Sequence, residues 1–388
     1  MRSDRKLLSI LSATTIAVSF AHSARAEEII IGAATAQTGA IAPYDQPSLA
    51  GLKYAIDQIN ANGGLGKKAK VTLLTKDTRS EAATTVTATQ ELIDEGAKIL
   101  VAPCDVDTGI AAGQIAQAAG IPAISTCAST PSLTSSVGDM MFLAAIPADN
   151  LQAAALATFA RKQGYKNAFV VKSPDNSYSL KLPEYFAQSF GGLGGKLVGD
   201  ALYQAGQPDF SAIVAKIKAA EPKPDVIMTS AYEPDFPVFI KAVRGAGIET
   251  PVLGSDGLVS PTITGLGHVV DGVVYSCAAF ASPGSALEAF NKKFTQDTGI
   301  AIDTTNYATG YDLGMLLDAA AAAAPTLDPK AIRDALANLS NFKGVSGTIT
   351  YAGTNRTPLR DVSLVKIQDG KLELVEAVTP DPKSVPQP

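Results

Sequence analysis

The sequence contains few residues of the types that build disulfide scaffolds or metal centres. Its 388 residues include three cysteines, Cys104, Cys127 and Cys277, and two histidines. An odd number of cysteines leaves at least one thiol unpaired, and their wide spacing is not that of a zinc site. His22 lies in the N-terminal segment, and His268 alone cannot form a histidine-rich metal site. We therefore expect no metal ion and no cofactor.

The short motifs of common enzyme classes are also missing. The sequence contains no G-x-S-x-G, no G-x-x-x-x-G-K-[ST] and no H-E-x-x-H. His268 could in principle serve a catalytic triad, but its surroundings are rich in Gly, Thr and Pro and hold no nucleophile motif. We therefore expect a protein that is not an enzyme.

An excess of positive charge and a second long apolar run are absent as well. The formal net charge is −5 and the sequence pI is about 5.2, so nucleic acid is not an expected partner. Beyond residue 26, no stretch reaches the roughly 20 apolar residues that a membrane-spanning helix needs. The alanine run 319–324 is too short and is stopped by Pro325.

The N-terminus has the pattern of a secretory signal. Basic residues within 2–6 precede an apolar run over 7–20, and Ala24–Ala26 has the A-x-A form of a cleavage site. A membrane anchor is the competing interpretation, but the apolar run is too short to span a bilayer. We expect residues 1–26 to be a cleaved signal peptide and the mature protein to be periplasmic.

The mature chain alternates short apolar runs with amphipathic helical runs. We expect strands at 29–34, 71–74, 99–102, 122–126, 168–171, 197–203, 226–230, 251–254, 347–351 and 362–367. We expect helices at 50–59, 81–94, 108–119, 183–190, 209–220, 236–246, 286–297 and 307–324. Two runs of alternating strands and helices predict an α/β protein of two doubly wound parallel-sheet lobes. Residues 379–388 are expected to form a loose terminus.

Parallel sheets also predict where a ligand should bind. In such sheets, ligands bind outside the carboxyl ends of the strands, and in two-lobed proteins they bind between the lobes. The residues that directly follow each strand are therefore the candidates for a ligand site.

Several segments resemble one protein family. They are D-Q-I-N-A-N-G-G-L at 57–65, the segments 71–77 and 81–96, Gly120–Thr126 with Ser129, D-F-S at 209–211 and G-Y-D at 310–312. Together they are similar to the branched-chain amino acid-binding proteins of ABC importers, which are type I periplasmic solute-binding proteins. The resemblance covers nearly the whole mature chain.

This resemblance implies an architecture and a role. The expected lobes comprise residues 27–147 plus 280–360 and residues 148–279 plus 361–388, joined by a three-strand hinge that closes a cleft. The protein would bind a small polar solute, an amino acid or a related compound. It would deliver this solute to a permease and ATPase complex at the inner membrane, and we expect it to act as a monomer.

The resemblance also implies four ligand-binding residues in the first lobe. Tyr44 matches an aromatic residue that lines the cleft. Asp105 matches a serine that holds the ligand carboxylate. Cys127 falls where the family has a small residue whose backbone touches the ligand, and Ser129 matches a second hydroxyl for the carboxylate.

Three further residues are implied in the second lobe. Tyr178 and Tyr232 match aromatic and ammonium contacts, and Asp256 matches the acid that pairs with the ligand ammonium. Asp256 lies in the segment G-S-D-G, which is also typical of a plain turn. Each tyrosine could instead be part of a core, and we expect about two of the three to line the cleft.

Asp105 departs from the family pattern. A carboxylate there would face the ligand's own carboxylate, and like charges disfavour each other in a desolvated cleft. Alternatively, Asp105 or Asp107 caps the helix that begins near Thr108. In both cases the anion-binding half of an amino-acid site is weakened, so the sequence favours a cationic or hydroxylated solute over a leucine-like zwitterion.

The sequence leaves the cysteine pairing and the class of function open. Cys104 and Cys127 end neighbouring strands, so a bond between them is conceivable, whereas Cys277 is expected to be a buried strand residue. The same lobes could serve a ligand-sensing receptor with a separate signalling partner. An enzyme that uses Asp105 and Asp256 as acid and base is a third interpretation.

Overall fold

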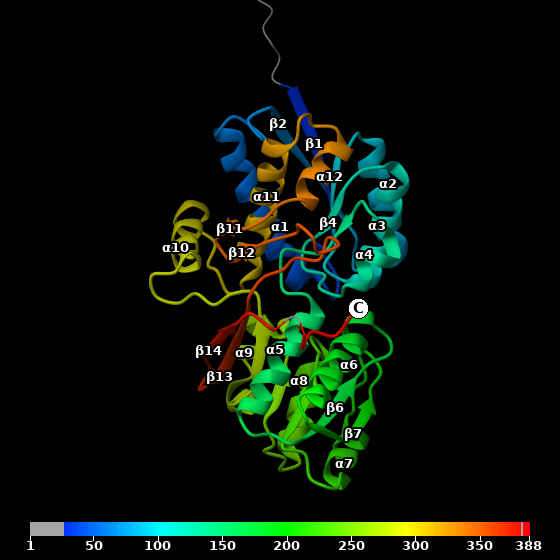
Figure 1. Ribbon diagram of the computed structural model, residues 1–388, viewed down its shortest axis with the longest axis vertical. Coiled ribbons are helices and arrows are strands. Elements are labelled where there is room, and N and C mark those ends of the chain that lie inside the picture. The colour runs from blue at the N-terminus through cyan, green and yellow to red at the C-terminus, as the bar shows by residue number, and fades with distance from the viewer. Residues whose placement is uncertain (1–26, 382) are drawn as a thin grey trace, which may run out of the picture.

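The structure is a computed structural model and describes residues 27–381 and 383–388. The predicted signal peptide, residues 1–26, therefore lies outside the described residues. The chain forms two α/β lobes stacked along the long axis of the molecule (Figure 1). None of the helices in the described part of the chain is long and apolar enough to cross a membrane.

The bounds of the elements are as follows. The strands are β1 (Glu27–Thr35), β2 (Ala69–Asp77), β3 (Ile99–Ala102), β4 (Ala123–Ser125), β5 (Met141–Phe142), β6 (Asn167–Lys172), β7 (Lys196–Leu202), β8 (Val226–Thr229), β9 (Val252–Gly254), β10 (Val274–Cys277), β11 (Phe342–Gly344), β12 (Gly347–Ile349), β13 (Val362–Gln368) and β14 (Lys371–Val378). The helices are α1 (Ala42–Ala61), α2 (Ala82–Asp94), α3 (Val106–Ala119), α4 (Ser132–Val137), α5 (Asp149–Lys162), α6 (Ser177–Gly192), α7 (Ser211–Ala219), α8 (Asp235–Gly245), α9 (Pro261–Thr264), α10 (Ala286–Thr298), α11 (Asn306–Ala323) and α12 (Pro329–Ala337).

The first lobe is built on a parallel sheet of order β2-β1-β3-β4-β5. Side chains of β1 alternate between the two faces of this sheet. Ile29 and Ile31 join a core formed with α1, α11 and α12, whereas Ala34 joins a core formed with α2 and α3. A nearly continuous apolar strand is therefore buried on both faces, as in doubly wound sheets.

The second lobe holds a larger sheet of order β14-β13-β10-β9-β8-β6-β7. The five strands from β10 to β7 are parallel, as the alternating pattern predicts. At the other edge, β13 pairs antiparallel with β10, and β14 pairs antiparallel with β13. The C-terminal strands can reverse direction because a tight turn at Asp369 and Gly370 joins them, both with positive φ.

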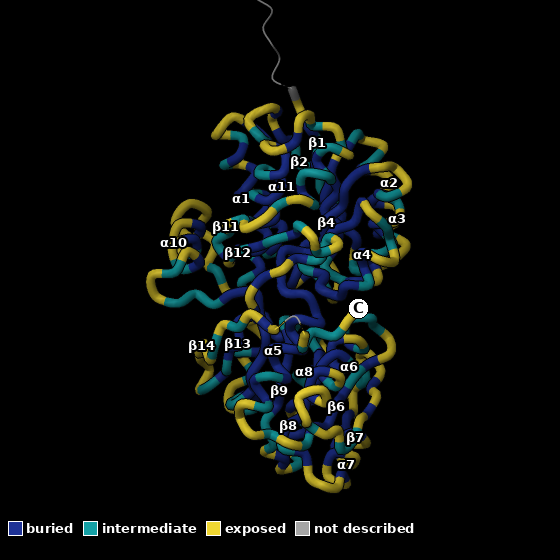
Figure 2. Tube along the Cα trace, viewed as in Figure 1, coloured by how far each residue is buried: buried dark blue, intermediate teal, exposed yellow. Residues whose placement is uncertain are grey.

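The chain passes between the two lobes three times. It crosses between β5 and β6, between β10 and α10, and between β12 and β13. Residues 143–149 of the first crossover are all buried, and Figure 2 shows the junction between the lobes as largely buried chain. Each predicted lobe boundary falls within one of these connections, which supports the predicted division; the boundaries themselves stay a prediction.

The C-terminal segment differs from expectation. The Ser384 and Pro386 carbonyl oxygens accept hydrogen bonds from the Ser189 hydroxyl and the Asn150 amide, at 3.1 and 3.0 Å. Val385 packs against the core between them. The expectation of a loose terminus is therefore wrong for these residues, which anchor the chain end to α5 and α6 beside the junction of the lobes (Figure 1).

Candidate functional site

A cavity lies between the two lobes. Its walls come from both lobes and from two of the crossover segments, which contribute Ile146 and Ala278. All the residues predicted to bind the ligand line it: Tyr44, Asp105, Cys127, Ser129, Tyr178, Tyr232 and Asp256.

The topology explains why residues so far apart in sequence meet here. Asp105 follows β3, and Cys127 and Ser129 follow β4. In the other lobe, Tyr232 follows β8 and Asp256 follows β9. Because all these strands are parallel to their neighbours, their carboxyl ends lie at one edge of each sheet, and the two edges face each other.

Hydrogen bonds bridge the lobes around the cavity. The Tyr44 hydroxyl donates to the Gly257 carbonyl oxygen at 2.9 Å, and the Asn176 side chain donates to Asp105 at 3.0 Å. At the rim, the Ser177 hydroxyl donates to Asp107 at 2.7 Å. These contacts join first-lobe and second-lobe residues, so the structure represents a closed arrangement of the cleft.

Asp105 caps a helix and also lines the cavity. Its Oδ1 accepts hydrogen bonds from the Thr108 backbone N–H and hydroxyl, both at 2.9 Å, which caps α3. Its Oδ2 accepts the bond from Asn176 in the other lobe. The two roles considered from sequence are thus compatible, because one carboxylate oxygen serves the helix and the other faces the second lobe.

Asp256 lies at the second-lobe side of the cavity, held by neutral donors. The Tyr178 hydroxyl and the Gln152 amide donate to it at 2.7 and 2.8 Å. Burial raises its pKa to about 6, and the hydrogen bonds from Tyr178 and Gln152 oppose this rise. No basic side chain is among the described residues that line the cavity, so this carboxylate lacks a counter-ion.

A second buried carboxylate, Asp149, lies behind Asp256 and was not predicted. One of its oxygens accepts a hydrogen bond from the Thr130 hydroxyl at 2.5 Å, and the other oxygen is buried without a hydrogen-bond partner. Burial, and then the charge of Asp256, raise the pKa of Asp149 to about 7. Burial and the neighbouring like charge thus favour the protonated form of one of these two carboxyl groups, so Asp256 is the main source of negative charge at this side of the cleft.

Three tyrosines form an aromatic wall that spans the lobes. The Tyr44 and Tyr232 ring centroids lie 6.2 Å apart at 86°, and those of Tyr178 and Tyr232 lie 5.9 Å apart at 66°. Burial raises the pKa of each hydroxyl, so all three stay neutral hydrogen-bond donors. The arrangement gives the cavity both ring faces and hydroxyl groups.

Comparison with known proteins places this architecture in a family. The family model described as "Periplasmic binding protein" matches residues 28–371. The chain belongs to the periplasmic binding protein family. It is a solute-binding protein of that family, with its ligand cleft between two lobes.

Individual relatives are similar along almost the whole chain. The Leu/Ile/Val-binding protein BraC3 of Rhizobium johnstonii is 27% identical over 376 residues, which cover 95% of this chain and 100% of that protein. The leucine-binding protein LivK of Thermotoga maritima has a TM-score of 0.83 at 23% identity, over 91% of this chain and 99% of that chain. A solute-binding protein of R. palustris in complex with benzoate has a TM-score of 0.79 at 22% identity, over 91% and 97%.

In this periplasmic binding protein, Asp45 organises the first-lobe wall of the cleft, which the sequence did not indicate. Asp45 is fully buried in the first turn of α1. It accepts hydrogen bonds from the Ala36 backbone at 2.7 Å, the Thr126 hydroxyl at 2.5 Å and the Cys104 backbone at 3.1 Å. These donors follow β1, β4 and β3, so a single carboxylate holds three strand ends together next to Tyr44.

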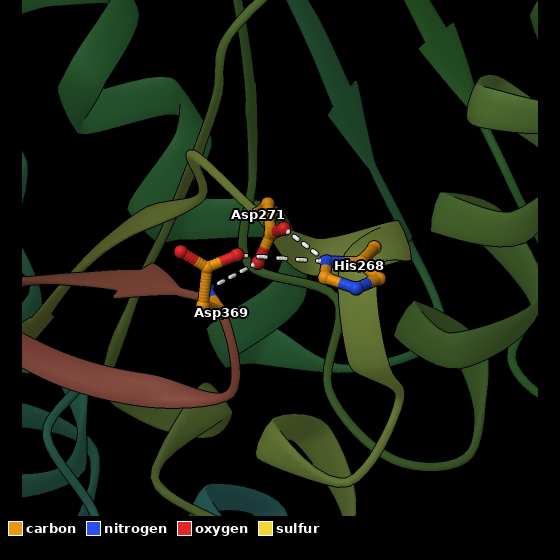
Figure 3. A group of neighbouring side chains, drawn as sticks. All are labelled: His268, Asp271 and Asp369. Carbon is orange, nitrogen blue, oxygen red and sulfur yellow. Dashed lines mark hydrogen bonds and ion pairs between the residues drawn. The ribbon is translucent and has the colours of Figure 1, made fainter.

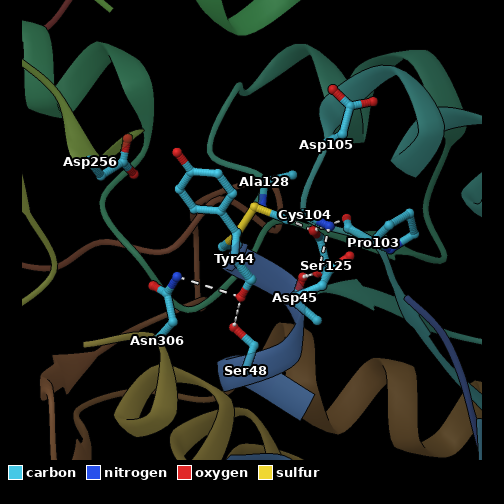
Figure 4. Close-up of a disulfide and its surroundings, with 12 residues drawn as sticks. Tyr44, Asp45, Ser48, Pro103, Cys104, Asp105, Ser125, Ala128, Asp256 and Asn306 are labelled. Atoms are coloured by element: carbon cyan, nitrogen blue, oxygen red, sulfur yellow. Dashed lines mark hydrogen bonds between the residues drawn. A yellow bond between two sulfur atoms is a disulfide. The ribbon is translucent and has the colours of Figure 1, made fainter. Parts of the chain in front are cut away.

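Cys104 and Cys127 form a disulfide, which decides a question that the sequence left open. Their Cα atoms lie 4.5 Å apart, and the sulfur atoms lie beside Tyr44 at the floor of the cleft (Figure 4). The bond joins the loops after β3 and β4, both of which line the cavity. Cys277 is free and buried in β10, which confirms the expectation for that residue.

Removing this disulfide should destabilise the protein by about 3 kcal/mol, because a crosslink that closes a loop of this length restricts the unfolded chain. The measurement is urea unfolding of the wild type and of the double variant Cys104→Ser/Cys127→Ser. A reducing agent should lower the wild-type stability to that of the double variant and leave the variant unchanged. Equal stability of oxidised and reduced wild type would contradict the prediction.

His268 lies far from the cleft. It precedes β10, at the edge of the sheet opposite to the strand ends that line the cavity. Its Nδ1 lies 2.8 Å from Asp271 and 3.7 Å from Asp369, as Figure 3 shows. Asp271 raises the pKa of this exposed histidine. The group is a hydrogen-bonded surface cluster on a turn, and it offers no catalytic partner to the cleft.

Proposed function

We propose that the protein is the periplasmic receptor of an ABC importer, and that the seven predicted residues lining the interlobe cavity hold its solute. The observation that carries this proposal is the cavity itself, which is walled by both lobes and bridged by hydrogen bonds between them. Only the closed form makes all these contacts, so a ligand in the cavity favours closure.

The cellular setting follows from the same role. Relatives such as BraC3 and the R. palustris protein are amino acid-binding and ABC-transporter proteins, which supports delivery of the bound solute to a permease and ATPase complex. Export by a cleaved signal peptide at residues 1–26 suits this location. The receptor binds its solute without converting it, acts as a monomer and has no nucleic-acid partner.

The test is a thermal-shift and calorimetric screen of residues 27–388. The compounds are aliphatic amino acids, organic amines, polyols and aromatic acids. A ligand present at about 100 times its Kd should add about 2.7 kcal/mol of stability. The expected result is one-to-one binding of at least one compound, which is recovered unchanged afterwards.

The site itself is tested by a matched pair of variants. Asp256→Asn should weaken binding of that compound at least tenfold, because it removes the charge at the second-lobe side of the cavity. Asp369→Asn, on the opposite edge of the same lobe, should leave affinity unchanged. Equal affinity of wild type and Asp256→Asn would contradict the assigned site, and chemical conversion of the compound would contradict the receptor role.

A further inference from the structure

The charged groups around the cavity are of one sign. Asp105 and Asp256 line it, and Figure 4 shows them on opposite sides of the Tyr44 ring. Asp149 lies behind Asp256 with one buried, unpaired oxygen. The lining residues in the described chain include no lysine, arginine or histidine. In a cavity between two lobes, such a set repels an anion and attracts a cation.

Asp105 makes the first-lobe side unfavourable for a carboxylate, although the Ser129 hydroxyl also lines it. Asp105 already occupies the N-terminal donors of α3, since the Thr108 N–H and hydroxyl both point to it. A ligand carboxylate placed there would compete for these donors and face a fixed negative charge. A zwitterion such as leucine therefore has a suitable partner for its ammonium at Asp256, whereas its carboxylate would meet the charge of Asp105 next to the Ser129 hydroxyl.

The tyrosines complete a site for positive charge. The rings of Tyr44, Tyr178 and Tyr232 meet edge to face within the cavity wall. A cation over the face of a tyrosine ring is attracted by the ring electrons, most strongly when the cation is desolvated.

We propose that the solute is a small organic cation that carries an ammonium-type nitrogen and no carboxylate. Its nitrogen would lie between Asp256 and the tyrosines, and a second donor of the solute would reach Asp105. This inference rests on the proposed receptor function, and it differs from the leucine-type ligands named for the relatives.

The test compares probes that differ by one charged group. Leucine, isoamylamine and 4-methylpentanoate share one aliphatic skeleton and differ in carboxylate and ammonium. Choline and 3,3-dimethylbutanol differ only in the cationic centre. By calorimetry, isoamylamine or choline should bind at least a hundredfold more tightly than its carboxylate-bearing or neutral counterpart.

The variant Asp105→Ser tests the effect of the Asp105 charge on binding separately from its effect on stability. Serine also caps helices well, so the variant should keep the stability of α3 while it removes the charge. We expect at least a tenfold loss of affinity for the cation, whereas Asp369→Asn should bind like the wild type. Tighter binding of leucine or benzoate than of any cation would overturn the inference and leave the receptor function intact. Binding by none of the compounds in either screen would count against both.

Discussion

Replacing Arg360 by methionine should remove about 3–5 kcal/mol from the free energy of unfolding, because it takes one partner out of a buried polar network. Arg360 is 4% exposed and lies in the third crossover. It donates to the carbonyl oxygens of Ala145 in the first crossover and Ala278 in the second. It also donates to the carbonyl oxygen of Ser346, whose hydroxyl donates to Asp312 at 2.5 Å. One guanidinium therefore ties the three connections between the lobes.

The measurement is urea unfolding, with two comparison variants. Arg360→Lys keeps the positive charge but not the planar arrangement of donors. Its free energy of unfolding should therefore fall less than that of Arg360→Met. Arg79→Met removes an exposed guanidinium and should stay within about 0.5 kcal/mol of the wild type. If Arg360→Met lowered the free energy of unfolding as little as Arg79→Met does, the hydrogen bonds of Arg360 would not stabilise the crossovers, and the prediction would be wrong.

Gly51→Ala should destabilise the protein by about 3 kcal/mol or more, since it forces α1 and α11 apart. A Cβ atom at Gly51 would lie 1.9 Å from the Tyr307 carbonyl oxygen, and one at Gly310 would lie 2.0 Å from the Ser48 carbonyl oxygen. The two helices thus touch backbone to backbone through reciprocal glycines. Because α1 also carries Tyr44, the variant should bind any ligand of the cleft more weakly.

Gly191→Ala is the matched control for this prediction. Gly191 is an exposed residue of α6, and a Cβ atom there would meet nothing within 4 Å. Alanine should therefore stabilise the protein by about 0.5–1 kcal/mol through its higher helix propensity. Thermal and urea unfolding of both variants check the pair. Similar effects of the two substitutions would contradict the close approach of α1 and α11.

The sequence patterns did not predict two parts of the fold, the helix α5 and the start of α1, and each has a physical reason. The helix α5 was not expected, because residues 149–160 are buried on nearly every side and show no amphipathic period. Gln152, which donates a hydrogen bond to the cavity residue Asp256, and the buried Asp149 lie on this helix and were missed with it. The start of α1 was also missed, since Pro43 and Pro47 are unusual helix residues, although Pro43 stands in the first turn.

The disulfide and the Asp45 network depend on information that a single sequence lacks. Cys104 and Cys127 follow adjacent strands, but whether their side chains face each other depends on the register of those strands. Asp45 receives donors from three strand ends, and these come together only after the sheet has formed. The predicted parallel strands indicate that these residues lie near one another at the strand ends. They do not indicate which side chains are in contact.

The sequence by itself determined the two α/β lobes and the strand ends at which a ligand would bind, because apolar periodicity and chain order are local properties of the chain. The seven residues expected in the cleft came from the family resemblance, and all of them line one cavity. The tertiary structure alone decided that Asp105 caps α3 and reaches Asn176, that Asp149 stands behind Asp256, and that Arg360 joins the crossovers. These contacts bring together residues far apart in the chain, and only the packing of one lobe against the other sets their distances.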